Sequence, residues 1–178
     1  HPFLMQEVKK ANEKTILLSN FSSVEASTTT ADGIRSTTAC FLIVDEAGFA
    51  RQIAEGFSSS LHTLNLVLAT YLDDLKHGKT SLRPWGIAIV SSPNGKTGRG
   101  EWFWNYWDKA RHPHSKYSLD EQNAYVPLRY HWSEVPEYDD VWYQQECKNL
   151  GFALARIRQE LDLIFLDSVS NLIPARLV

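Results

Sequence analysis

Two short runs of apolar residues, separated by a segment with helical periodicity, constrain the fold of this chain more than any other feature. The runs are Cys40–Val44, CFLIV, and Trp85–Val90, WGIAIV. Neither alternates polar and apolar residues, so each is expected to be a strand buried on both faces of a parallel sheet. Apolar residues recur at helical spacing from Leu61 to Leu75, which predicts a helix. Ser58–Ser60 offer N-cap candidates for this helix, and His77-Gly78 is a suitable stop.

The order strand, helix, strand, helix between Cys40 and Ala110 is typical of an α/β domain with a mostly parallel sheet. Outside that core we expect a loop over residues 111–125 and six further elements. They are strands at Thr15–Leu18, Val24–Thr29, residues 125–132 and residues 163–168, and helices at Asp139–Leu150, closed by Gly151, and Phe152–Leu161. The last element of the core is a helix over residues 101–110.

Composition excludes several classes of protein. The chain has 178 residues, a net charge of -3 and a pI of about 6.1. It therefore lacks the net positive charge of a protein that coats nucleic acid. Its two cysteines do not make a disulfide framework. No apolar run approaches the roughly 18 residues that a membrane span needs, and no signal peptide is recognisable. We therefore expect a protein that is neither secreted nor inserted in a membrane.

Two adjacent carboxylates, Asp45 and Glu46, follow the first apolar strand directly. Ligands of α/β sheets bind at the carboxyl ends of the strands, so the position suits a functional site. In one class of nucleotide hydrolases an Asp at this place helps to hold Mg²⁺, often through water, and the next Glu polarises the attacking water. The alternative is that the pair only caps the following helix.

The loop after the second strand contains Gly95-Lys96-Thr97, the last three letters of a phosphate-binding P-loop. A P-loop also needs a glycine five positions before Gly95, and Val90 stands there. The tripeptide therefore fails as a Walker A motif. Ser91 and Ser92 lie at the strand end instead, before the turn signal Pro93-Asn94-Gly95, which indicates either a polar sensor or an ordinary connection.

Together these segments resemble the ATPase domain of the large terminase subunit of tailed bacteriophages, a DNA-packaging motor. Asp45–Phe49, DEAGF, resembles the family's Walker B ending, DEA.F. Ser91–Gly95, SSPNG, followed by Trp102–Trp104, WFW, resembles its coupling motif, STPNG…WFY.

Three further segments agree with this resemblance. Gly33–Ser36, GIRS, resembles an xxRG segment, with serine in place of the final glycine. Residues 131–142 resemble the family's tryptophan- and proline-containing segment. Residues 156–174 resemble its F.QEY.C.F ending; Gln159-Glu160 and Phe165 match, while leucines replace the aromatic residue and the cysteine.

The resemblance implies a partial RecA-like, ASCE-type P-loop NTPase domain with three layers. Asp45 would help to hold Mg²⁺, and Glu46 would activate water to attack ATP. Ser91, Ser92, Asn94 and Gly95 would sense the γ-phosphate and couple its loss to DNA movement. Candidate contacts to DNA or phosphate are Lys96, Arg99 and Arg35.

The resemblance also implies partners and a cellular place. The partners would be double-stranded DNA, the portal protein, the small terminase subunit and further copies of the chain in a ring. The site of action would be the host-cell cytoplasm, transiently at the procapsid portal. Because no G-x-x-x-x-G-K-[ST] precedes Asp45, we expect residues 1–174 to be part of the ATPase domain without its Walker A loop. Residues 175–178 would begin a linker toward a nuclease domain.

Other interpretations stay open at this stage. A DEAD-like helicase or translocase would share the acidic strand end, and a non-catalytic interaction domain would share the fold. His112, His114 and His131 do not have convincing metal-ligand spacing. Trp102, Trp104 and Trp107 suit core packing better than base stacking, because they share one predicted helix with other aromatic residues.

Overall fold

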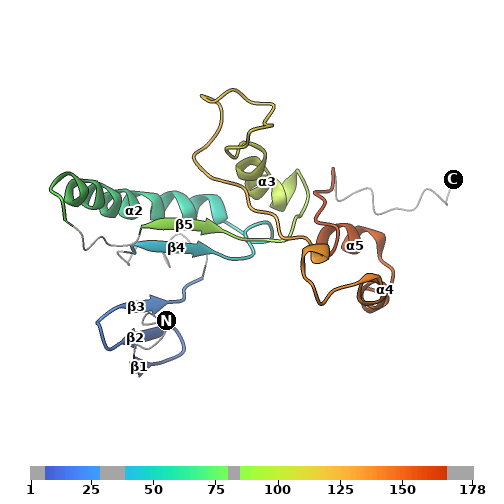
Figure 1. The fold of residues 1–178 in the computed structure, drawn as a ribbon, viewed down its shortest axis with the longest axis horizontal. Coiled ribbons are helices and arrows are strands. Elements are labelled where there is room, and N and C mark those ends of the chain that lie inside the picture. The colour runs from blue at the N-terminus through green and yellow to red at the C-terminus, as the bar shows by residue number, and fades with distance from the viewer. Residues whose placement is uncertain (1–6, 29–38, 80–84, 168–178) are drawn as a thin grey trace. The chain divides into compact units, whose positions relative to one another are not determined.

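The computed structural model describes residues 7–28, 39–79 and 85–167. It is a mixed α/β structure with a three-stranded antiparallel sheet and a two-stranded parallel sheet (Figure 1). The chain divides into two compact units. The first takes its described residues from His1–Cys40 and Ala54–Trp85, and the second takes them from Phe41–Ile53 and Gly86–Val178.

The first unit contains an antiparallel sheet in the order β1-β2-β3. Its strands are β1, Val8–Ala11, β2, Thr15–Leu18, and β3, Ser23–Glu25. The expected strand at β2 is confirmed. The second expected strand, Val24–Thr29, is observed as β3, which ends at Glu25 and is therefore shorter than predicted. Its last residue, Thr29, lies outside the described residues. β1 was not predicted, because VKKA is too polar and too short to give a strand pattern.

Helix α2 covers Ile53–Lys76 and begins earlier than its leucine repeat predicts. The expected N-cap at Ser58–Ser60 is wrong, because these serines lie inside the helix. Their hydroxyl groups donate hydrogen bonds to the carbonyls of Ala54, Glu55 and Gly56, four residues earlier. Phe57, which is only 2% exposed, extends the apolar face before the leucines. The end of the helix before His77-Gly78 is confirmed.

The buried face of α2 is formed by its first half. Ile53, Phe57 and Leu64 are buried, whereas Leu72 and Leu75 near the other end are exposed. The Leu64 carbonyl also accepts a hydrogen bond of 2.8 Å from the indole N–H of Trp85. The predicted apolar stripe is therefore buried only over part of its length among the described residues.

The second unit contains the parallel pair of β4, Phe41–Val44, and β5, Gly86–Ile89. The two strands run in register from Phe41 opposite Gly86 to Val44 opposite Ile89, which confirms the predicted parallel pairing. The expected burial on both faces is wrong for β4, since Phe41 and Ile43 are 49% and 64% exposed. Successive side chains of a strand point to opposite faces, and only the face that carries Val44 is well covered here.

Among the described residues of the second unit, three α-helices follow, and all were predicted. They are α3, Glu101–Asp108, α4, Asp140–Asn149, and α5, Leu154–Glu160. The Asp139 side chain caps α4 by accepting a hydrogen bond from the Trp142 N–H. Buried Cys147, Ile157 and Leu161 form a core between α4 and α5. Phe165 packs against three aromatic rings of α3, which are Phe103, Trp104 and Trp107.

Two predicted strands of this unit are absent from the described residues. Residues 125–130 have no regular structure, and Trp132–Glu134 form a short 3-10 helix. Pro127 has no N–H to contribute to a strand ladder, and Val126 and Leu128 are exposed. Near the end of the chain only Leu166 forms a bridge, which is parallel and pairs with Gly95. Ser168 of that expected strand lies outside the described residues.

Candidate functional site

The residues singled out after the two apolar strands lie at one edge of the parallel sheet. β4 ends at Val44, directly before Asp45-Glu46, and β5 ends at Ile89, just before Val90 and Ser91. Because the strands are paired in parallel, their carboxyl ends meet at the same edge. The structure therefore brings together the acidic pair and the serine-containing loop that the sequence predicted as neighbours. We call Asp45–Phe49 the acidic turn and Ser91–Lys96 the serine loop.

The acidic turn has an unusual backbone. Glu46 adopts a left-handed conformation with φ of 52°, which costs an L-residue about 1–2 kcal/mol. An Asp45 carboxylate oxygen accepts a hydrogen bond of 2.9 Å from the Glu46 N–H. The Glu46 carbonyl accepts from the N–H groups of Phe49 and Ala50, which closes the turn. The alternative that the acidic pair caps the next helix is wrong, because α2 begins only at Ile53.

Both carboxylates of the acidic turn face solvent. Asp45 and Glu46 are exposed, and within the described residues no ion pair involves either side chain. One oxygen of Asp45 is engaged by the Glu46 N–H, which leaves the other available. A ligand can therefore contact the two side chains without breaking an ion pair to any described residue.

The acidic turn is tied to the serine loop by main-chain and side-chain hydrogen bonds. Gly48 donates its N–H to the Ser91 hydroxyl oxygen at 3.0 Å, and its carbonyl accepts from the Asn94 side-chain amide at 2.8 Å. The Ala47 N–H donates to the Val90 carbonyl at 3.1 Å. A Cβ at position 48 would lie 3.0 Å from the Ser91 hydroxyl oxygen and 3.3 Å from the Ser92 carbonyl oxygen, so a larger residue would push the serine loop away by a few tenths of an ångström.

The two serines have different roles in this contact. The Ser91 hydroxyl accepts from Gly48 and donates to the Ser92 carbonyl at 2.8 Å, so its only donor hydrogen and one of its two lone pairs are used. Ser92 contributes its carbonyl to the same network. Both side chains are half-buried. A change in the position of the acidic turn must therefore alter the hydrogen bonds of Ser91.

The opposite side of the serine loop contacts the end of the described chain. The Asn94 side-chain oxygen accepts from the Gln159 amide of α5 at 3.1 Å. Leu166 donates its N–H to the Asn94 carbonyl, and its own carbonyl accepts from the Lys96 N–H. The serine loop thus lies between the acidic turn and the segment after α5. Gln159 was noted in the sequence only as part of the resemblance, and nothing in its local pattern predicts this long-range contact.

Of the basic residues predicted to contact DNA or phosphate, Lys96 and Arg99 have different surroundings. The Lys96 ammonium is 2.6 Å from an Asp167 carboxylate oxygen and 5.1 Å from the centre of the Trp104 ring. Arg99 is exposed within the short 3-10 helix Gly98–Gly100. Arg35 and the GIRS segment lie outside the described residues. Lys96 is therefore partly occupied by contacts within the second unit, and Arg99 is exposed to solvent.

Asp45 offers a carboxylate oxygen that a metal ion could contact. Among the described residues no group of three or more His, Cys, Asp or Glu side chains is arranged to bind a metal ion. Mg²⁺ binds carboxylate oxygens and retains several waters, so the second oxygen of Asp45 is a chemically suitable ligand. Waters and phosphate oxygens could supply further ligands.

The Trp104 ring reaches this edge through its contact with Lys96, whereas the histidines of the second unit make their contacts elsewhere. His112 and His114 lie together, with ring centres 5.5 Å apart, whereas His131 contacts the Ser133 hydroxyl. Trp104 and Trp107 pack on Phe165, which agrees with the expected core packing only in part, because both side chains are half-buried and keep some accessible surface.

No protein-family model matches this chain, and comparison with curated proteins gives no match. Of the helices that the structure describes, none combines the length and the apolar character needed to cross a membrane.

Proposed function

We propose that this chain carries the water-activating and phosphate-sensing part of a DNA-packaging ATPase of the terminase type. The observation that carries the proposal is the contact between the acidic turn and the serine loop through Gly48, Ser91 and Asn94. A motor must convert the state of a nucleotide into movement, which requires an element that responds to the phosphate. A hydroxyl bound to the turn that bears the catalytic carboxylate would supply such a response.

Each residue of the edge has a role in this proposal. Asp45 would hold Mg²⁺ mainly through water, and Glu46 would orient and polarise the water that attacks the γ-phosphate. Ser91 and Ser92 would change their hydrogen bonds when the phosphate leaves, and Asn94 and Gly95 would transmit that change toward Leu166. When bound, ATP would supply the γ-phosphate that water attacks, and Mg²⁺ would supply Lewis-acid stabilisation of the charge on the phosphate oxygens.

The wider features of the proposal come from the same resemblance. The parallel pair of β4 and β5 would belong to the sheet of a RecA-like domain with three layers. Residues 1–174 would form part of that ATPase domain, without its Walker A loop, and residues 175–178 would begin a linker. The partners would be double-stranded DNA, a portal protein, a small terminase subunit and other copies of the chain in a ring. The motor would act in the host-cell cytoplasm at the procapsid.

The first test uses the 178-residue chain itself. Because its sequence has no Walker A motif, it lacks the backbone cradle and the lysine that bind ATP phosphates. We expect no Mg²⁺-dependent ATP turnover at a motor-like rate in a phosphate-release assay. Robust turnover that Glu46→Gln abolishes would show that the chain contains its own phosphate grip and would refute this expectation.

The second test concerns the coding sequence upstream of His1 and any longer protein that it encodes. A Walker A motif there would support the proposal. In that protein Glu46→Gln should reduce hydrolysis by about 10²- to 10⁴-fold while ATP still binds. Ser91→Ala should preserve ATP binding but reduce the DNA packaged for each ATP hydrolysed. Hydrolysis that survives Glu46→Gln would contradict the assignment of the base.

A further inference from the structure

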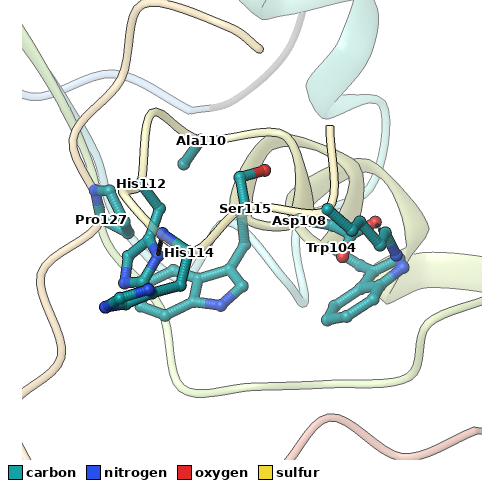
Figure 2. Close-up of a pocket in the computed structure, with 9 residues that line it drawn as sticks. Trp104, Asp108, Ala110, His112, His114, Ser115 and Pro127 are labelled. Atoms are coloured by element: carbon teal, nitrogen blue, oxygen red, sulfur yellow. Dashed lines mark hydrogen bonds and ion pairs between the residues drawn. The ribbon is translucent and has the colours of Figure 1, made fainter. Parts of the chain in front are cut away.

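A second candidate site lies beside α3, away from the acidic turn. It is an open pocket of about 320 Å³, which we call the α3 pocket (Figure 2). Figure 2 shows His112 and His114 at one end, Trp104 and Asp108 at the other, and Ser115 between them. The volume is at the lower end of the range of about 300–1,000 Å³ for small-molecule sites, so the pocket can hold only a small ligand.

The walls of the α3 pocket are aromatic and supported from behind. Trp104 and Trp107 both line it. Phe165 packs against these two indoles, with ring centres 4.8 Å and 6.1 Å away. Both side chains are half-buried. The tryptophans therefore form a supported aromatic surface that is still partly accessible.

The histidine end of the pocket is polar and partly oriented. The Nδ1 atom of His112 accepts a hydrogen bond of 3.0 Å from the His114 N–H. In the neutral ring the proton must then be on Nε2, which becomes a donor. The His114 ring is exposed, and the described residues provide it with no hydrogen bond or ion pair. One ring is thus fixed as a donor, and the other is available for stacking.

The single carboxylate that lines the pocket, Asp108, is already paired with a cation. Asp108 accepts a hydrogen bond of 2.7 Å from the Tyr117 hydroxyl and lies 2.9 Å from the Lys116 ammonium. Burial alone would raise the pKa of Asp108, but the Tyr117 and Lys116 contacts lower it below its usual value. The carboxylate therefore stays ionised and paired, and it does not repel an approaching anion as a free charge would.

The segment along one side of the pocket is basic. Residues 109–116, KARHPHSK, contain three Lys or Arg residues and two histidines but no acidic residue. Of the three cations only Lys116 lines the pocket, where it pairs with Asp108, so Lys109 and Arg111 would have to attract a phosphate from beside it. Aromatic surfaces beside basic side chains are the combination by which proteins bind unpaired nucleotides, because bases stack on the rings and the cations attract phosphates. An isolated apolar ligand would not explain the basic segment, and an isolated phosphate would not explain the two tryptophans.

We propose that the α3 pocket binds one unpaired nucleotide, with its base stacked among the Trp104, Trp107 and His114 rings and its phosphate near the basic segment. The site is separate from the acidic turn, and the proposal does not rest on ATP hydrolysis. The nucleotide can belong to a single strand of nucleic acid or be free in solution, since both present the same ring and phosphate.

The experiment measures the fluorescence anisotropy of a labelled thymidine strand of about 12 nucleotides titrated with the full chain. We expect saturable binding that weakens with salt, and His114→Ala should raise the dissociation constant by about five-fold or more, as loss of a stacking ring does. His114→Phe keeps a ring and should restore most of the affinity. His62→Ala is the matched control, because His62 is exposed on α2 and does not line the pocket.

Two further measurements separate the sources of the ligand and exclude misfolding. A duplex of the same sequence should bind more weakly than the single strand. Competition by deoxythymidine monophosphate would assign the pocket to free nucleotides, whereas failure to compete at the same phosphate concentration would assign it to strands. In the unsubstituted chain, the imidazole NMR signals of His112 and His114 should shift on titration while that of His62 does not.

Several results would overturn the proposal. They are the absence of binding by both the strand and the monophosphate, equal affinity for strand and duplex, unchanged affinity in His114→Ala, and unchanged His112 and His114 signals. The NMR readout does not depend on a variant and therefore decides the question even if His114→Ala fails to fold.

Discussion

Asn94 is the residue whose removal tests the architecture of the sheet edge most directly. Its side chain makes three hydrogen bonds: it donates to the Gly48 carbonyl at 2.8 Å and accepts from the Gly95 N–H at 2.8 Å and from the Gln159 amide at 3.1 Å. A hydrogen bond of this kind contributes about 1 kcal/mol net. Asn94→Ala should therefore lower the free energy of unfolding by about 3 kcal/mol.

The assay is urea unfolding followed by tryptophan fluorescence. Five of the six tryptophans lie within Gly86–Val178, so the signal reports mainly on the unit that contains Asn94. Asn105→Ala is the matched control, because Asn105 is exposed on α3, and its cost should stay within about 0.5 kcal/mol. Gln159→Ala removes one of the three bonds and should cost about 1 kcal/mol.

A double-mutant cycle isolates the contact between the serine loop and α5. Asn94→Ala and Gln159→Ala share one hydrogen bond, so together they should cost about 1 kcal/mol less than the sum of the single effects. The reasoning would be refuted by a cost of Asn94→Ala no larger than that of the Asn105 control. Strict additivity of the two substitutions would show that the Asn94–Gln159 bond does not stabilise the unit.

Two other predictions follow from the geometry of the second unit. A Cβ at Gly100 would lie 2.2 Å from the Gly95 carbonyl oxygen, so Gly100→Ala should force the loop apart and cost about 3 kcal/mol or more in the same unfolding assay. Burial, together with the hydrogen bond to Asp162 and its charge, raises the pKa of Tyr143 from 10.0 to about 12. Because the folded pKa exceeds the unfolded one, the stabilisation is complete below pH 10 and is lost as pH rises to about 12. In a titration of phenolate absorbance, Asp162→Asn should lower the Tyr143 pKa but leave it above 10.0, because the effect of burial persists; an unchanged titration would contradict the assigned contact.

The local elements of this protein were largely determined by sequence patterns. Continuous apolar runs predicted β4 and β5 and their parallel pairing, and the helical repeat predicted most of α2. These patterns predict elements correctly because side chains repeat with a characteristic period in strands and in helices, and that period depends only on residues close together in the sequence. The start of α2 was missed because serines are favourable N-caps and are also tolerated inside a helix, where they bond to carbonyls four residues earlier.

The candidate site was predictable only in its residue types. Asp45, Glu46, Ser91 and Asn94 could be named from the sequence, because they follow two strands that were expected to be parallel. Their hydrogen bonds could not be predicted, since the Gly48–Ser91 contact joins residues 43 positions apart and the Asn94–Gln159 contact joins residues 65 positions apart.

The sequence by itself determined that the acidic pair and the serine loop follow adjacent strands. Tertiary structure alone decided that Gly48 lies against Ser91, that Lys96 pairs with Asp167 rather than being free, and that tryptophans and histidines surround the α3 pocket. The physical reason is that periodicity specifies which face of an element is apolar, whereas loop closure and packing decide which distant residues meet.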